Sequence, residues 1–219
     1  MIAENLTSNT IIPLRTSDTG EEALTIMNDF YVRHLPIVNN RQLLGLISED
    51  DILDYDATEA VGSYSLAFNR PFVRKSDHIY EVMRQMAQHE LTVIPVVDSD
   101  DIYVGLVTQE DLLQYFARMS SFTEQGTILV LEVSKHDYSL SEIARIVESE
   151  SAKILSSFTT TDAYSTKVQV TLKINAQYIQ NIIATFQRFD YTIKASFNES
   201  DYLESLQERY ESFMNYLSV

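Results

Sequence analysis

An internal repeat dominates the first half of this 219-residue chain. Two copies of one pattern, over residues 6–58 and 65–119, are offset by about 60 residues, and such a repeat usually means that one structural unit is built twice. The second copy has one inserted residue before its last matching block. The matching blocks are 15–18 with 74–77, 34–38 with 93–97, and 45–55 with 105–115.

Each copy has the same predicted order of elements. A helix begins near Thr19 in the first copy and near Asp77 in the second, and Thr19 with Glu22 has the spacing of a capping box. The segments that follow are a strand at 35–38 or 93–97, a second strand at 43–47 or 103–107, and a helix that begins at Ser48 or Thr108. Strands that alternate with helices in such short units predict an α/β arrangement.

Both copies also carry a proline-containing apolar strand followed by a Gly-Leu motif. The first reads Leu-Pro-Ile-Val and then Gly-Leu-Ile-Ser-x-x-Asp, within 35–51. The second reads Ile-Pro-Val-Val and then Gly-Leu-Val-Thr-x-x-Asp, within 94–111. This pattern resembles the CBS domain, the family named after cystathionine beta-synthase. The resemblance implies that the two copies pack into one module whose clefts hold AMP, ATP or S-adenosylmethionine.

Two pairs of residues at the helix starts, Ser48 with Asp51 and Thr108 with Asp111, have two alternative interpretations. A Ser or Thr at the N-cap and an acid three residues later form a capping box, which explains all four residues without a ligand. A carboxylate near a helix start also accepts hydrogen bonds from both hydroxyls of a ribose, and free N–H groups beside it suit a phosphate. The resemblance to CBS nucleotide sites implies that both aspartates hold ribose and that Ser48 and Thr108 contact ribose or phosphate.

Basic residues near these motifs are candidates for binding phosphate. Arg33 precedes the first apolar strand, where the resemblance implies a phosphate-binding base, but the second copy has the uncharged Thr92 at that position. The two clefts are therefore expected to differ. Because long basic side chains are usually exposed, salt bridges with the many acids are the alternative role for each of them. The candidates are Arg15, Arg33 and His34 in the first copy, and Arg74 and Lys75 in the second.

The composition limits the classes of partner. Acidic residues outnumber basic ones by 32 to 16, and a formal net charge of −16 disfavours nucleic acid and anionic membranes as partners. No cysteine is present, which excludes disulfides and thiolate metal sites. Neither a secretory signal nor a membrane-spanning run is recognised, so a cytoplasmic protein is expected.

The second half of the chain, residues 126–198, follows a different pattern. Strands are predicted at 128–133, 154–158, 168–174 and 191–197, and helices at 140–147 and 179–186. The order βαββαβ is the ferredoxin-like pattern, so the whole chain is expected to combine α/β and α+β folds.

This half resembles the ACT domain, and its place after a CBS pair resembles acetoin-utilisation-type CBS proteins. The loop at 135–140 lacks the glycine that amino-acid-binding ACT domains typically carry in their first strand-to-helix loop. The resemblance therefore implies an assembly element more than an amino-acid site.

Residues 199–219 are predicted to form a C-terminal amphipathic helix. The helix either docks on its own sheet or pairs between subunits. Since CBS pairs and ACT sheets commonly pair within their families, a homodimer is expected. The apolar positions at helical spacing are Leu203, Leu206, Tyr210, Phe213 and Leu217.

These features favour a non-catalytic regulator. An adenosine-type nucleotide would bind the cleft and shift the population between two packings, and an unidentified partner protein would read the change. The alternative is a structural homodimer with vacant clefts. An enzyme has the least support, because the sequence contains no catalytic motif and its four histidines lack the spacing of zinc ligands. No catalytic residue, required cofactor or metal site is therefore expected.

Overall fold

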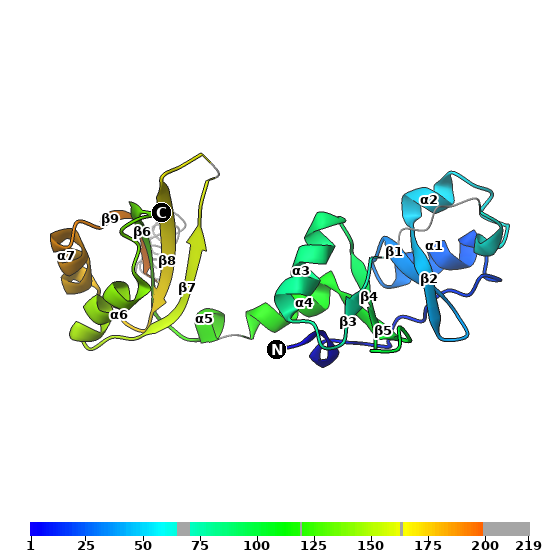
Figure 1. Ribbon diagram of the computed structural model, residues 1–219, viewed down its shortest axis with the longest axis horizontal. Coiled ribbons are helices and arrows are strands. Elements are labelled where there is room, and N and C mark those ends of the chain that lie inside the picture. Colours follow the sequence, from blue (N-terminus) through cyan, green and yellow to red (C-terminus); the bar gives the residue numbers. More distant parts are fainter. Residues whose placement is uncertain (65–70, 119, 163, 199–219) are drawn as a thin grey trace, which may run out of the picture. The chain divides into compact units, whose positions relative to one another are not determined.

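The computed structural model describes residues 1–64, 71–118, 120–162 and 164–198, and the chain divides into two compact units, Met1–Phe116 and Ala117–Val219 (Figure 1). Within the described ranges, no helix combines the length and the apolar character that crossing a bilayer requires. The C-terminal helix expected at 199–219 lies outside the described residues.

The first unit contains the repeat as predicted, each copy having a helix, an antiparallel strand pair and a second helix. In each copy a leading segment pairs in parallel with the proline-containing strand, as a single bridge between Leu14 and Ile37 in one copy and as strand β3 in the other. The elements of the first copy are η1 (Ala3–Asn5), α1 (Gly20–Asp29), β1 (His34–Asn39), β2 (Gln42–Ser48) and α2 (Glu49–Leu53). Those that follow are η2 (Val61–Ser63), β3 (Val73–Arg74), α3 (Ile79–Gln88), β4 (Val93–Val97), β5 (Tyr103–Thr108) and α4 (Gln109–Ala117).

The helix starts follow the capping chemistry of the sequence. The Thr19 hydroxyl accepts a hydrogen bond from the Glu22 backbone N–H at 3.2 Å, and the Glu22 carboxylate accepts one from the Thr19 N–H at 2.8 Å. This reciprocal capping box satisfies two N–H groups that the first turn leaves open. In the second copy the N-cap is His78, one residue later than predicted, and its Nδ1 accepts from the Tyr80 N–H at 3.2 Å.

The segments that lead into the two copies are exchanged. Residues 1–5 dock on the second copy, where the Ala3 N–H donates to the Asp77 carbonyl at 2.8 Å. Residues 57–63 dock on the first copy, where the Val61 N–H donates to the Asp18 carbonyl, also at 2.8 Å. Each copy is thus completed by the segment that leads into the other, a relationship of pseudo-twofold symmetry.

The two copies also share one hydrophobic core. Equivalent strand positions from both copies are fully buried in a single cluster, at Leu35, Ile37 and Ile47 in the first copy and at Ile94, Val96 and Val107 in the second. Burying each of these side chains contributes about 1.5–3 kcal/mol. Neither half of this core is complete without the other, so the pair is one packing unit.

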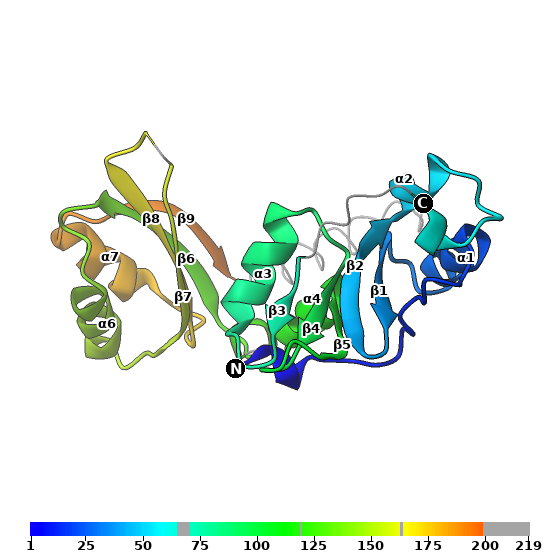
Figure 2. The ribbon, with the colours of Figure 1, turned by 45° about the vertical axis from the view of Figure 1, so that its right-hand side comes forward.

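The second unit has the predicted βαββαβ order. Its antiparallel sheet has the strand order β7-β8-β6-β9, which is the ferredoxin-like topology. Both longer helices cover the same face of this sheet (Figures 1 and 2) and pack on a core that includes Leu131, Leu172 and Phe186. The elements are α5 (Ser120–Thr123), β6 (Thr127–Ser134), α6 (Leu140–Ser149), β7 (Ile154–Thr160), β8 (Lys167–Ile174), α7 (Gln180–Arg188) and β9 (Thr192–Asn198).

A β-bulge interrupts the alternation of the last strand. The pairing of β6 with β9 shifts between Val130 and Leu131, so Ile193 lies opposite Leu131 and Ala195 lies opposite Val130. Since consecutive strand residues point to opposite faces, Ile193 shares the core face with Leu131, whereas Ala195 lies on the other face. Phe197 lies beyond the bulge and is exposed.

Candidate functional site

A cavity of about 250 Å³ lies between the two copies, against the start of helix α4. Its walls come from three segments: the N-terminal segment, the turn between α1 and β1, and the second copy from the start of β4 to the first turns of α4. The lining residues are Ser8, Thr10, Ile11, Phe30, Tyr31, Val32, Thr92, Leu106, Thr108, Gln109, Glu110, Asp111 and Gln114. Two predicted site residues, Thr108 and Asp111, are therefore part of it.

Thr108 and Asp111 form a capping box at the floor of this cavity. The carboxylate Oδ2 of Asp111 accepts hydrogen bonds from the Thr108 N–H at 2.9 Å and from its hydroxyl at 2.7 Å. The Thr108 hydroxyl in turn accepts from the Asp111 N–H at 3.0 Å. The two hydrogen bonds that the carboxylate accepts from Thr108 both end on Oδ2, so Oδ1 is the carboxylate oxygen available to a ligand.

The first copy repeats this geometry at Ser48 and Asp51. Asp51 Oδ2 accepts from the Ser48 N–H at 2.8 Å and from its hydroxyl at 2.6 Å, and the Asp51 N–H donates to the hydroxyl at 3.0 Å. The capping role predicted from the sequence is thus present in both copies. It does not exclude a ligand role, because one carboxylate oxygen suffices for the cap.

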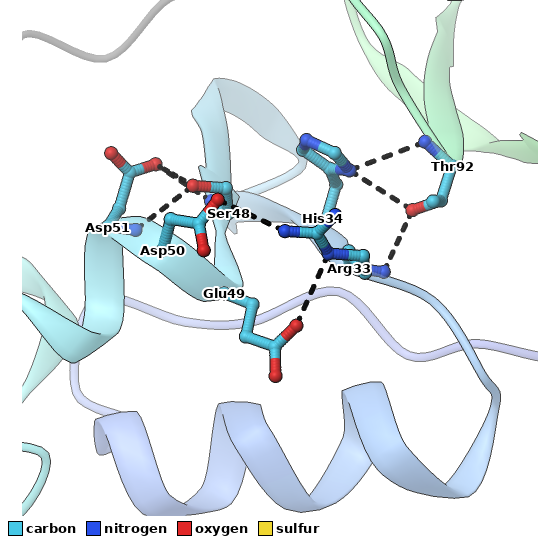
Figure 3. Close-up of polar contacts among 7 residues, drawn as sticks. All are labelled: Arg33, His34, Ser48, Glu49, Asp50, Asp51 and Thr92. Atoms are coloured by element: carbon cyan, nitrogen blue, oxygen red, sulfur yellow. Dashed lines mark hydrogen bonds and ion pairs between the residues drawn. The ribbon is translucent and has the colours of Figure 1, made fainter.

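Arg33, His34 and Thr92 join the two copies beside the cavity (Figure 3). The Arg33 backbone N–H donates to the Thr92 hydroxyl at 2.8 Å, and His34 Nδ1 lies 3.1 Å from the same hydroxyl. The guanidinium of Arg33 turns away toward the start of α2, with Nη2 lying 3.1 Å from Asp50 Oδ2 and Nε 3.4 Å from Glu49 Oε2. In this arrangement Arg33 neutralises acids of its own copy.

Burial lowers the pKa of His34, and the neighbouring Arg33 guanidinium lowers it further, against the opposing charges of Asp51 and Asp50. The imidazole is thus held in its neutral form. The Thr92 backbone N–H, 3.3 Å from Nδ1, can only donate, so Nδ1 is assigned as the acceptor and Nε2 carries the proton. His34 is therefore a polar link between the copies rather than a cation.

The other predicted cations are placed elsewhere. Arg74 Nη2 pairs with Asp101 Oδ1 at 2.9 Å, and its Nη1 donates to the Asp98 carbonyl at 3.2 Å. Arg15 lines a separate surface pocket with Arg41 and Tyr103. Neither arginine lines the cavity at Asp111. Both stay candidates only for other surfaces.

Several cavity residues were not anticipated from the sequence. Phe30 and Tyr31 come from the first copy but line the cavity of the second, because the turn before β1 crosses to the other repeat. Ser8 reaches the cavity through the exchanged N-terminal segment, where it pairs with Leu106 in both directions at 2.8 and 3.0 Å. The reciprocal exchange of leading segments depends on contacts between residues far apart in the chain, which local sequence patterns do not display.

The cavity wall differs from its counterpart in the first copy. The repeat offset makes Phe30, Tyr31 and Thr92 equivalent to His89, Glu90 and Arg33. Tyr31 has a φ of 53° and Glu90 a φ of 52°, so both occupy the left-handed region at the end of their helix.

Among the described residues, no group of three or more His, Asp or Glu is arranged to hold a metal ion.

Comparisons with known proteins identify the repeat. The family model of the CBS domain matches residues 3–58 and 66–118. An uncharacterized 33.4 kDa protein in the ribosomal RNA operon of Thermofilum pendens is 26% identical over 132 residues, which are 51% of this chain and 44% of that protein. A homoserine O-acetyltransferase of Methanohalobium evestigatum is 29% identical over 98 residues, which are 42% of this chain and 19% of that enzyme.

The chain thus spans less than half the length of these curated relatives. Among solved structures, a CBS domain pair/ACT domain protein from Thermotoga maritima is 21% identical, covers 53% of this chain and 96% of its own, and superposes with a TM-score of 0.48. The family match falls on both repeats, which exchange leading segments and share one core. The first unit of this chain is therefore a tandem pair of CBS domains.

Proposed function

We propose that this chain is a non-catalytic regulator that binds an adenosine-type nucleotide between its two CBS domains. The cavity at Thr108 and Asp111 carries the proposal, because it is a concave site between the copies with a carboxylate, hydroxyls and aromatic rings in its wall. Its volume of about 250 Å³ is just below the usual range of small-molecule sites, about 300–1,000 Å³, which favours a small ligand.

Asp111 is the proposed ribose acceptor. Its Oδ2 is used by the cap, which fixes the carboxylate, and none of the described residues bonds to its Oδ1, which can accept from ribose hydroxyls. A charged hydrogen bond of this kind contributes about 1.5–3 kcal/mol. Thr108 holds the carboxylate in place, and the rings of Phe30 and Tyr31 offer a surface for a base. In the first copy Ser48 and Asp51 are the proposed equivalents, with Arg33, His34 and Arg15 as further candidates, and Arg74 is a further candidate in the second copy, away from the cavity.

Calorimetric titration of the full chain with AMP, ADP, ATP and S-adenosylmethionine tests this function. We expect at least one of them to bind with a dissociation constant between about 1 µM and 1 mM. Asp111→Ala is expected to weaken that binding at least tenfold, by about 1.4 kcal/mol or more. Asp51→Ala is the matched variant, because it removes the same capping box from the other copy. Heat signals equal to buffer for all four compounds would rule the function out.

A structural homodimer without a small-molecule ligand is the second candidate. The capping boxes favour it, because they give Ser48, Asp51, Thr108 and Asp111 a complete role within the protein. This alternative predicts a dimer at micromolar concentration by light scattering and no response to nucleotides. A monomer under those conditions would count against it.

For the second unit we propose an ACT-like role in assembly. The ferredoxin-like sheet supports this proposal, as does the glycine-free loop between β6 and α6. The proposed division is CBS domains at 6–58 and 65–119, an ACT-like domain at 126–198 and a C-terminal helix at 199–219. A cytoplasmic location, a homodimer and an unidentified regulated protein complete the proposal, with acetoin-related regulation as one setting for it.

A further inference from the structure

We propose that the cavity at Asp111 selects adenosine-type ligands that carry no phosphate, such as adenosine or a 5′-thioether nucleoside. This inference rests on the proposed function and narrows its ligand class. It comes from the charges, hydrogen bonds and rings of the cavity wall.

The charges in the wall oppose a phosphate. Glu110 and Asp111 both line the cavity, and among the described residues its lining includes no lysine, arginine or histidine. Arg33, the phosphate-binding candidate of the first copy, instead forms ion pairs with Asp50 and Glu49 through its guanidinium. The equivalent residue at the cavity is Thr92, which is uncharged. A phosphate would thus face two carboxylates, and none of the lining residues that the structure describes offers a neutralising cation.

The start of helix α4 does not compensate for the missing cation. A helix N-terminus binds anions through its open N–H groups. Here the Gln109 N–H donates to the Thr92 carbonyl and the Asp111 N–H donates to the Thr108 hydroxyl, each at 3.0 Å. The carboxylates of Glu110 and Asp111 also offset the positive end of the helix dipole. The Thr108, Gln109 and Asp111 N–H groups are therefore already bonded within the chain, which leaves the Glu110 N–H as the group that could meet an anion.

The aromatic part of the wall suits a neutral base. The Tyr31 side chain is 93% exposed, so one face of its ring is available for stacking. Its left-handed backbone conformation is the one in which helices commonly end, and Glu90 shares it, so the side chain and not the backbone distinguishes this position. Phe30 is a second aromatic residue in the lining. Stacking on these rings would hold an adenine without using charge.

The first test compares ligands that differ in phosphate. Wild-type chain is titrated by calorimetry with adenosine, 5′-methylthioadenosine, AMP and ATP at pH 7.5 and low salt. Adenosine and the thioether are expected to bind at least about tenfold more tightly than AMP, since each phosphate charge meets two carboxylates at close range. Raising the salt to about 0.5 M is expected to narrow this ratio, because salt screens the repulsion.

Matched variants locate the binding and its charge dependence. Asp111→Ala is expected to weaken adenosine binding at least about tenfold, while Glu22→Ala, which removes the capping box of α1 away from the cavity, leaves it within about twofold. Tyr31→Gly is expected to weaken it severalfold, while Glu90→Gly, at the equivalent backbone position, leaves it unchanged. Glu110→Gln is expected to raise AMP affinity severalfold, and Asp50→Asn, the equivalent substitution in the first copy, is not. Urea unfolding of each variant checks that it folds.

The outcomes separate this inference from the function on which it rests. AMP or ATP binding as tightly as adenosine, with the binding lost in Asp111→Ala alone, would overturn the inference and leave nucleotide sensing intact. Adenosine binding that neither Asp111→Ala nor Tyr31→Gly weakens would also overturn it, because the ligand would then lie elsewhere. If none of these four compounds bound, the inference would fail, and if ADP and S-adenosylmethionine did not bind either, the proposed function would fail with it.

Discussion

The imidazole Nδ1 of His34 accepts hydrogen bonds from both the hydroxyl and the backbone N–H of Thr92, at 3.1 and 3.3 Å. This link crosses from the first CBS domain to the second, beside the cavity. A protonated imidazole has no lone pair with which to accept these bonds. The interface between the repeats therefore contains one contact that depends on pH.

The pH dependence of stability follows from His34. Burial and Arg33 hold its pKa below the ordinary value of 6.5 in the folded state. Between the two pKa values the unfolded chain binds more protons, so the free energy of unfolding rises with pH. The contribution is complete above about pH 6.5 and is lost as the pH falls toward the folded-state pKa. Urea unfolding at pH 7.5, 6.5 and 5.5 measures it.

His34→Gln is the control for that experiment, because glutamine keeps an acceptor and does not titrate. The stability difference between wild type and this variant is expected to shrink as the pH falls from 7.5 to 5.5. Equal slopes for both proteins would show that other groups produce the pH dependence.

The hydroxyl of Thr92 supports two neighbours, and its removal is the second prediction. Thr92→Val keeps the shape of the side chain but deprives the Arg33 N–H of its partner and His34 Nδ1 of one of its two donors. We expect the free energy of unfolding to fall by about 0.5–1.5 kcal/mol. The loss is modest because water can reach the Arg33 backbone N–H and replace the missing partner. Chemical denaturation measures the loss. Thr92→Ser keeps the hydroxyl, so a loss as large as that of Thr92→Val would contradict this explanation.

Gly105 allows the N-terminal segment to reach the second CBS domain. Its φ is 150°, and an added Cβ would lie 2.7 Å from the Ser8 carbonyl oxygen. Gly105→Ala is therefore expected to destabilise the chain by about 1–3 kcal/mol and to expose the N-terminal segment to proteolysis. Ser8→Ala changes only a side chain that the clash does not involve, and it is expected to have little effect. An undisturbed N-terminal segment in Gly105→Ala would contradict the prediction.

Two tyrosines, Tyr64 and Tyr103, are expected to respond in opposite directions to the loss of their hydroxyls. The buried Tyr103 hydroxyl has no hydrogen-bond partner among the described residues, and burial raises its pKa. The Tyr64 hydroxyl donates to the Asp56 carbonyl at 3.1 Å. Tyr103→Phe is expected to be neutral or stabilising, because it removes an unpaired polar atom. Tyr64→Phe is expected to destabilise by about 0.5–1.5 kcal/mol. Thermal unfolding compares the two, and a destabilised Tyr103→Phe would indicate a missing partner.

The elements of both units follow closely from local sequence. The strand predicted at 93–97 coincides with β4, and the capping box predicted at Thr19 and Glu22 has both of its hydrogen bonds. Such features depend on side-chain periodicity and on residues three or four apart, which the sequence displays directly. The bulge that turns Ala195 and Phe197 away from the core cannot be predicted in this way, because it depends on how β9 pairs with β6.

The candidate site was harder to predict for the same reason. The sequence singled out Thr108 and Asp111 through the repeat, and both line the cavity. It did not point to Tyr31, because this residue belongs to the first copy and reaches the second only through the packing of the pair. The direction of the Arg33 guanidinium, toward Asp50 rather than the cavity, likewise depends on side-chain geometry that the repeat alone does not reveal.

The exchanged leading segments mean that a cut between the two copies would not release two self-sufficient halves. A fragment beginning after residue 64 would lack the Ala3 segment that covers its own copy, and it would leave behind the Val61 segment on the other. Mixing the complementary fragments should therefore restore a heterodimer, whereas either fragment alone would expose core side chains to water and aggregate. The two copies therefore fold only as a pair.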